Sequence, residues 1–290
     1  MIVLEQVAPN ALGSALAVVG DEWNLLLVQQ AILGRRRYSD FQAALRIGPT
    51  VLSQRLSGLV DVGVLERSGK EGYALTPCGA GLWPVLLSIW AWEQEWVQGE
   101  ALPTMRHLEC GAVFAPELAC AACGSLVERG DVTTEWGPSG VMERSVPRGS
   151  LRRRVGSDRP VGAGLFPDTM TLIGSRWSAA VLGAAFLGAR RFSEFESALG
   201  APPNVVAERL RSFVAVGVLD EAYVLTAKGR ALFPVVAMTV RWGEQWFRVA
   251  EGPALVSQHV GCGAAFVPVL HCSVCESTLH RRSIAVEGAP

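Results

Sequence analysis

The sequence contains an internal duplication, and this feature constrains its fold more than any other. Shifted by 154 positions, Gly20 and Trp23 align with Gly174 and Trp177. The shift falls to 150 by Tyr73, because the second copy has lost four residues where a loop is expected. Repeats of this length are whole domains rather than solenoid turns. The 290 residues are therefore expected to form two similar domains, each followed by a small module.

Six of the seven cysteines form two sets with the same spacing, and each set begins with a histidine. In each set a His-x2-Cys turn and a Cys-x2-Cys turn are separated by nine residues. Two such turns facing each other make a tetrahedral Cys3His site that suits Zn²⁺, and four protein ligands indicate a structural role. We predict two zinc ions per chain, one in each module, with the ligands His107, Cys110, Cys120 and Cys123, and His259, Cys262, Cys272 and Cys275.

Free thiols or a redox switch built on the same CxxC pairs are the alternative interpretation of these cysteines. His271 lies beside Cys272 and is a competing ligand, but the first copy has Ala119 in its place. His280 and Cys78 are expected to be ordinary surface or core residues.

Each domain begins with a pattern that predicts three helices. The apolar spacing after Trp23 predicts a helix that ends at Gly34. Ser39 and Ser193 are predicted to be the N-caps of the second helix in the two copies. A turn at Pro49 then precedes the third helix.

A short hairpin and a long helix complete the domain. Residues 64–65 and 73–75 are predicted strands, and residues 68–72 form the hairpin tip between them. Thr76 caps the final helix, in which Pro84 and Pro234 are expected to cause a kink. Helix, helix, turn, helix and hairpin is the order of a winged helix-turn-helix.

The combined motifs resemble the HxlR-type winged-helix regulators, a branch close to the MarR-like fold. Both copies contain Gly-x-x-Trp, Gly-x-Arg-Arg-(Tyr/Phe)-Ser-(Asp/Glu)-Phe, Gly-Val-Leu and Leu-Thr-x-x-Gly, within residues 11–97 and 165–247. Such regulators are usually dimers of one unit that repress or activate transcription, with terminal helices at the dimer interface. The resemblance implies a mainly α fold with small β elements, two tandem winged-helix domains with zinc-ribbon-like modules, and a covalent pseudo-dimer.

The predicted boundaries follow from the repeat. Residues 1–98 form the first winged-helix domain, 99–136 the first zinc module, 137–166 a linker, 167–248 the second winged-helix domain, and 249–290 the second zinc module. The linker is rich in Gly, Pro and Arg, and no periodicity there favours a helix or strand. Its arginines serve either solubility or contact with a DNA backbone.

The third helix is the predicted recognition helix, and basic residues around it are candidates for phosphate contact. The net charge of the chain is only −1, so attraction to DNA depends on local clusters. The second wing carries Asp220 and Glu221, which repel phosphate and make the two copies unequal. Solvated surface is the alternative for these arginines, and Arg55 and Arg209 lie beside the core. The predicted DNA-binding residues are Arg35, Arg36, Arg37, Thr50, Ser53, Gln54, Arg55, Arg67, Lys70, Arg190, Arg191, Asn204, Arg209 and Arg211.

The leading hypothesis is a cytoplasmic, sequence-specific DNA-binding transcriptional regulator, and not an enzyme. No nucleophile triad, phosphate loop or paired-carboxylate site is evident, and no apolar run reaches the roughly 18 residues of a membrane span. The expected partner is double-stranded DNA, with a small-molecule effector and further homodimerisation both left open. The alternatives are a thiol-based redox-sensing regulator, or a ligand-binding or protein-docking module in which the nine tryptophans line an apolar pocket between the units.

Overall fold

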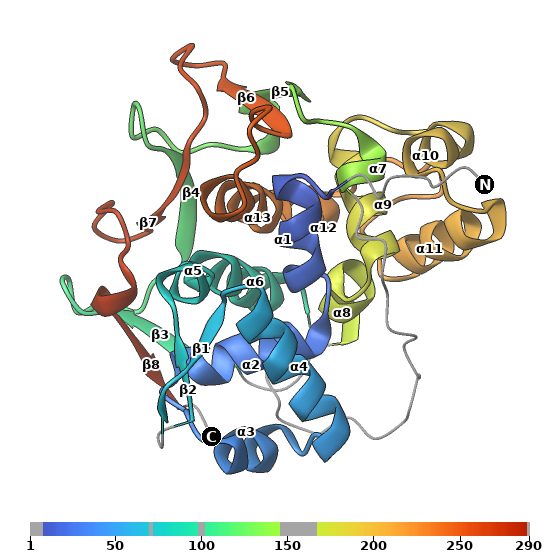
Figure 1. Ribbon diagram of the computed structural model, residues 1–290. Helices are drawn as coiled ribbons and strands as arrows, with labels where there is room; N and C mark the ends of the chain where they lie inside the picture. The colour runs from blue at the N-terminus through green and yellow to red at the C-terminus, as the bar shows by residue number, and fades with distance from the viewer. Residues whose placement is uncertain (1–7, 70–71, 98–101, 146–166, 289–290) are drawn as a thin grey trace.

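The computed structural model describes residues 8–69, 72–97, 102–145 and 167–288, and it contains two winged-helix units against a strip of small sheets (Figure 1). The first unit comprises α1 (Ala11–Val19), α2 (Glu22–Ile32), α3 (Tyr38–Leu45), α4 (Pro49–Asp61), β1 (Leu65–Arg67), β2 (Tyr73–Leu75), α5 (Pro77–Ala80) and α6 (Trp83–Trp96). The second comprises α8 (Pro167–Ile173), α9 (Arg176–Phe186), α10 (Phe192–Leu199), α11 (Pro203–Ala215), α12 (Ala227–Arg230) and α13 (Phe233–Trp246).

The predicted order of elements is confirmed, but two local predictions are wrong. The helices α3 and α10 begin before Ser39 and Ser193, with Arg37 and Arg191 at the N-cap position. In α3 the Asp40 carboxylate accepts a hydrogen bond from the Arg37 backbone N–H at 3.1 Å, so an acid in the first turn replaces the serine cap. The chain thereby exposes the serines on the first turn instead of using them as caps.

Proline breaks the final helix of each unit rather than kinking it. Thr76 caps α5 as predicted, because its Oγ1 accepts the Gly79 N–H at 3.1 Å. That helix ends at Ala80, and Pro84 then occupies the first turn of the separate helix α6. Proline lacks a backbone N–H, so the first turn of a new helix is where it costs least.

Other differences from the sequence-based predictions concern the linker and the two wings. A short helix, α7 (Met142–Ser145), lies within the predicted linker, and residues 146–166 lie outside the described part of the chain. The hairpin β1–β2 forms as expected, although Lys70 at its tip also lies outside the described residues. The second wing is reduced to a bridge between Leu219 and Leu225.

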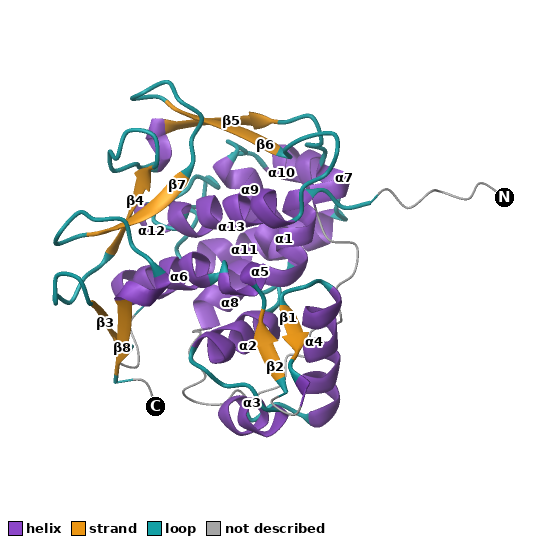
Figure 2. Ribbon diagram, turned by 60° about the vertical axis from the view of Figure 1, so that its left-hand side comes forward, coloured by secondary structure: helices purple, strands orange, loops and turns teal. Residues whose placement is uncertain are grey.

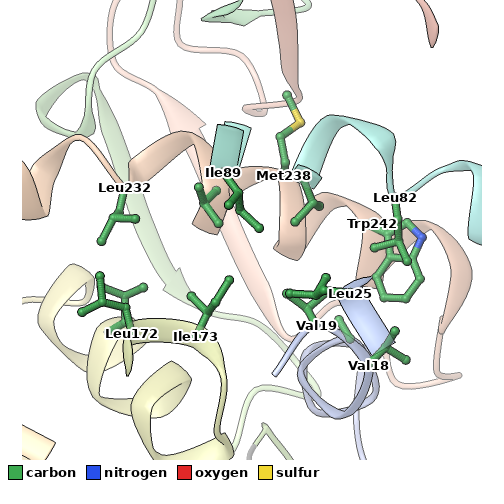
Figure 3. Close-up of a cluster of buried hydrophobic side chains, with 14 of the residues drawn as sticks. Val18, Val19, Leu25, Leu82, Ile89, Leu172, Ile173, Leu232, Met238 and Trp242 are labelled. Carbon is green, nitrogen blue, oxygen red and sulfur yellow. The ribbon is translucent and has the colours of Figure 1, made fainter. Parts of the chain in front are cut away.

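The two units share one hydrophobic core. Val18 and Leu25 of the first unit and Leu172 and Trp242 of the second belong to one buried cluster (Figure 3). No single described helix is long and apolar enough to cross a membrane, and α1 and α2 pass that test only as a pair bent by 79°.

Equivalent residues of the two units make reciprocal contacts across this core. The Trp92 indole N–H donates to the Lys228 carbonyl at 3.0 Å, and the Trp242 indole N–H donates to the Cys78 carbonyl at 2.9 Å. Trp92 and Cys78 align with Trp242 and Lys228 at the same shift of 150 positions. A contact in which residue i meets j and j meets i is the signature of a two-fold, isologous interface.

The helix packing around this interface is not symmetric. At Gly243 of α13, an added Cβ would lie 2.8 Å from the Ala11 carbonyl oxygen and from the Ala15 Cβ, so α1 crosses α13 very closely. The equivalent position on α6 is Glu93, which is 1% exposed and accepts a hydrogen bond from the Thr169 hydroxyl of α8. The contact of α1 with α13 therefore relies on a small residue, whereas the contact of α8 with α6 relies on a buried hydrogen bond.

The remaining strands form three two-stranded antiparallel sheets in a row along one side of the helices (Figure 2). Every sheet joins a strand of the first module to a strand of the second. In the central sheet Leu118 pairs with Leu270, its own equivalent at a shift of 152 positions. The pseudo-two-fold axis that relates the two modules therefore passes through this pair. The pairs are β3 (Thr104–His107) with β8 (Ile284–Glu287), β4 (Pro116–Cys120) with β7 (Pro268–Cys272), and β5 (Val132–Trp136) with β6 (Leu255–His259).

Candidate metal centres and nucleic-acid interface

Because each of the three sheets joins the two modules, the eight predicted metal ligands come together in two groups. These are not the groups expected from the sequence. In each group a His-x2-Cys turn of one module faces the Cys-x2-Cys turn of the other module. The prediction that each module holds its own ion is therefore wrong. The two groups are His107, Cys110, Cys272 and Cys275, and Cys120, Cys123, His259 and Cys262, and within each group the ligand atoms all lie within 4.8 Å of one another.

The distances within the groups match the edges of a metal tetrahedron. His107 Nδ1 lies 3.4 Å from Cys110 Sγ and 3.3 Å from Cys275 Sγ, and Cys110 Sγ lies 4.0 Å from Cys272 Sγ. Bonds of about 2.3 Å to sulfur and about 2.0 Å to nitrogen imply edges of about 3.5–3.8 Å in a tetrahedral zinc site. A disulfide requires about 2.05 Å between sulfurs, so these geometries suit a metal ion.

The second group has the same geometry and burial. His259 Nδ1 lies 3.4 Å from Cys123 Sγ and 3.2 Å from Cys262 Sγ. In both groups the histidine and the first cysteine of the CxxC turn are buried, while the other two cysteines are exposed. Each group therefore sits at the surface end of a sheet, with half of its ligands fixed by the packed interior.

Serine residues favour the metal-binding form of one thiol in each group. A hydrogen bond from Ser125 lowers the pKa of Cys123 to about 6, and one from Ser277 lowers the pKa of Cys275 to about 6. The thiolate is the form of cysteine that binds metals, so these two thiols are the more readily ionised ligands. In the same two groups burial raises the pKa of Cys272 and of Cys262. His271 belongs to neither group and lies 3.2 Å from the Thr278 hydroxyl, and Cys78 is a buried free thiol outside both.

The predicted recognition helix presents a polar, uncharged face. Thr50, Ser53 and Gln54 of α4 are exposed, while Leu52 and Leu56 on the opposite side are fully buried. Side chains with hydroxyl and amide groups can hydrogen-bond to base edges and phosphates. The burial pattern therefore leaves the surface of α4 available where a helix-turn-helix protein reads DNA.

Arg55 does not share that face. Its guanidinium forms an ion pair with the Asp21 carboxylate at 2.7 Å, and the two side chains are only 18% and 24% exposed. Burial raises the pKa of Asp21, while the charge of Arg55 opposes that shift. Arg55 thus joins α4 to the N-terminus of α2. This corrects the prediction that Arg55 lies on the exposed face of α4 and binds DNA. The motif Gly-x-x-Trp contains Asp21, so the acid was visible in the sequence although its partner was not.

The other basic residues of the first unit have mixed positions. Arg36, Arg37 and Arg67 are exposed, and the Arg67 guanidinium lies over the Tyr73 ring at 5.9 Å. Arg35 is half-buried and donates to the Gln30 side chain at 2.6 Å. Three of the five described arginines predicted in this unit are therefore exposed, and Arg35 and Arg55 are not.

The second unit carries different charges around its third helix. Arg209 lacks an equivalent of Asp21, because Ser175 aligns there, and it pairs with Glu208 at 2.9 Å. The acids Asp220 and Glu221 are exposed in the segment that corresponds to the wing of the first unit. Arg190, Arg191, Asn204 and Arg211 are exposed.

Comparison with known proteins places this arrangement in a family. The model of the HxlR-like helix-turn-helix family matches twice, at residues 18–101 and 172–251, which together exceed half of the chain. The chain belongs to the HxlR-like helix-turn-helix family. This is a family of transcriptional regulators and not of enzymes, so the two polar-faced third helices are those of DNA-binding domains.

Three curated relatives are similar to parts of this HxlR-like chain. Uncharacterized HTH-type transcriptional regulators of Mycobacterium bovis and of Mycobacterium tuberculosis strain H37Rv are each 33% identical over 131 residues, covering 42% of this chain and 83% of the relative. Another from Bacillus subtilis is 34% identical over 90 residues, covering 29% of this chain and 83% of the relative. No solved structure matches.

Proposed function

We propose that this HxlR-like protein is a sequence-specific transcriptional regulator whose two units act as a covalent pseudo-dimer on one DNA site. The observation that carries the proposal is the reciprocal contact of equivalent residues, seen in the two tryptophan hydrogen bonds and in the Leu118–Leu270 pair. Dimeric helix-turn-helix proteins bind paired half-sites about one helical turn apart. A chain with its own two-fold interface has the geometry for this without a second molecule.

The two units contribute unequally to this binding. Thr50, Ser53 and Gln54 give α4 a polar face without an exposed acid between them, whereas Glu208 is exposed on α11. Together with the acidic second wing, this charge pattern favours stronger base readout by the first unit. The expected operator has two half-sites, of which the one under α4 is the more sharply defined.

Zinc in both Cys3His groups would hold the two units together. Each group takes two ligands from each module, and tetrahedral sets of four protein ligands are structural rather than catalytic. Zinc would therefore link the halves at both ends of the central sheet, and fix the spacing between the two recognition helices. We expect two zinc ions per chain.

Selection of random duplexes by the full zinc-loaded chain, followed by fluorescence anisotropy across a salt series, tests the proposal. We expect an enriched sequence, and a slope of log K against log salt that becomes shallower by about 1 for Arg37→Gln, because one phosphate contact is lost. The combined Ser53→Ala and Gln54→Ala variant should relax base preference in one half-site.

The matched control is Arg282→Gln, the same charge change at an exposed residue of the 3-10 helix at Arg281–Ser283. It should leave the salt slope unchanged. Absence of an enriched sequence, or equal effects of Arg37→Gln and Arg282→Gln, would contradict DNA reading by the first unit and favour the docking or ligand-binding alternative.

A further inference from the structure

A large apolar cavity lies where the second unit meets α1 and the first module. It has a volume of about 700 Å³ and lies between α1, α9, α13 and the β5–β6 sheet. This volume is within the range of small-molecule sites, which are mostly apolar with a few polar groups. Its lining includes Leu16, Ala180, Phe233, Val236 and Leu255. Of the tryptophans only Trp136 is among the lining residues, so the cavity is distinct from the tryptophan-lined pocket considered from the sequence.

The cavity corresponds to smaller side chains than those at the equivalent positions of the first unit. Where α2 has Leu26 and Gln29, α9 has Ala180 and Gly183. An added Cβ at Gly183 would meet no atom within 4 Å. The second unit therefore has less side-chain volume along this wall than the first unit, which leaves room for a ligand.

The same contrast appears on α13. Val240 lines the cavity, whereas its equivalent on α6 is Trp90, whose indole N–H donates to the Pro103 carbonyl at 2.9 Å. The first unit thus has a large aromatic ring where the second has a short aliphatic side chain. By contrast, the interface residue Trp242 retains its tryptophan counterpart, Trp92.

Arg241 gives the cavity a cationic group that the first unit lacks, since Ala91 is its equivalent. Its side chain is half-buried and donates one hydrogen bond to the Pro268 carbonyl. Burial lowers its pKa, and no charged neighbour among the described residues offsets that effect. A half-buried guanidinium with unused N–H donors favours an anion, and carboxylates match its planar geometry.

The other charged groups of the cavity wall are already engaged. Arg129 donates to the carbonyls of Phe186 and Val132. Glu244 accepts the Ala254 N–H at 2.7 Å. Arg248 is exposed and donates to the backbone of Glu244. Three arginines and one glutamate leave the wall net positive. Arg241 and Arg248 each donate one hydrogen bond, and Arg241 is the half-buried one of the two.

We propose that this cavity binds an organic anion, a carboxylate on an apolar aromatic or aliphatic body, with the body between α9 and α13 and the carboxylate at Arg241. A role of this ligand as the effector rests on the proposed function as a regulator. The binding itself does not, because it depends only on the cavity and its cation.

The test uses 1-anilinonaphthalene-8-sulfonate as a fluorescent probe of the zinc-loaded full chain, with 2-naphthoate and neutral 2-naphthamide as competitors. We expect saturable binding of one probe per chain and at least tenfold stronger competition by naphthoate than by naphthamide. Gly183→Gln, which restores the first unit's residue, should weaken probe binding more than tenfold. Arg241→Gln should remove most of the preference for naphthoate.

Gly58→Gln is the matched control, because Gly58 is also a helical glycine with nothing within 4 Å of an added Cβ, but lies on α4 away from the cavity. It should bind the probe like the native chain, and Val240→Trp supplies a second blocking variant if Gly183→Gln melts early. No saturable binding, or equal binding by the native chain and both blocking variants, would overturn the proposal. The result is independent of DNA binding, so the two proposals can fail separately.

Discussion

Paired cysteine substitutions can distinguish crossed zinc sites from sites within each module by the metal content alone. Cys110 and Cys275 belong to one group in the structure, so Cys110→Ser with Cys275→Ser destroys one site and should leave about one zinc per chain. Cys110 and Cys123 belong to different groups, so Cys110→Ser with Cys123→Ser should leave almost none. Ligands held within each module would give the opposite pair of values.

The geometry of the central sheet keeps the two groups of ligands far apart, so the two double variants should differ clearly in zinc content. Cys120 pairs with Pro268 at one end of the β4–β7 sheet, and Cys272 pairs with Pro116 at the other. The two ends are four residues apart, or about 13 Å at roughly 3.3 Å per residue. Since zinc bonds are only about 2.3 Å long, one ion cannot take ligands from both ends.

Metal analysis by mass spectrometry of chains purified without chelator provides the measurement. Both double variants lose two thiols, so they control for each other, and Cys78→Ala, which removes the cysteine outside both groups, should retain two zinc ions. About one zinc in the Cys110/Cys123 variant and almost none in the Cys110/Cys275 variant would refute the crossed arrangement. Fewer than two in the native chain would refute the zinc assignment itself.

Two further predictions concern stability. Arg55→Ala should lower the free energy of unfolding by about 2 kcal/mol, measured by urea denaturation, because Asp21 loses its partner in a largely buried pair that solvent only partly screens; an unchanged midpoint would show that the pair contributes nothing. Gly243→Ala should lower the thermal midpoint, because its Cβ would lie 2.8 Å from the Ala15 Cβ. Gly183→Ala should instead raise the free energy of unfolding by up to about 1 kcal/mol, because alanine has the higher helix propensity and its Cβ would point into open space. A change of stability in the same direction for both variants would contradict the packing described.

The sequence identifies the eight ligands because each two-ligand turn is a local feature with a fixed spacing. It does not identify which turns face each other, since a duplicated chain offers two pairings with the same local geometry. The choice follows from the pairing of β4 with β7, and strand pairing between residues such as Leu118 and Leu270 is non-local.

The remaining errors have similar causes. Ser39 has the right residue type for a cap, but the Asp40 carboxylate accepts the Arg37 backbone N–H, and the helix begins at Tyr38 instead. Arg55 has the right position for reading DNA, but Asp21, 34 positions earlier in the sequence, provides a partner. In both cases an acidic residue, Asp40 or Asp21, forms a contact that favours a local structure other than the predicted one.

The crossed sites explain how the two units can diverge while the pseudo-dimer persists. Neither group of ligands is complete without the other half, so filling both sites in the crossed pairing also holds the halves in their reciprocal positions. Substitutions in the cavity wall, at Gly183 or Val240, and in the second wing, at Asp220, lie outside these contacts and leave the reciprocal tryptophan pair in place. A homodimer must place any such change in both subunits, whereas a fused chain can assign DNA reading to one unit and ligand binding to the other.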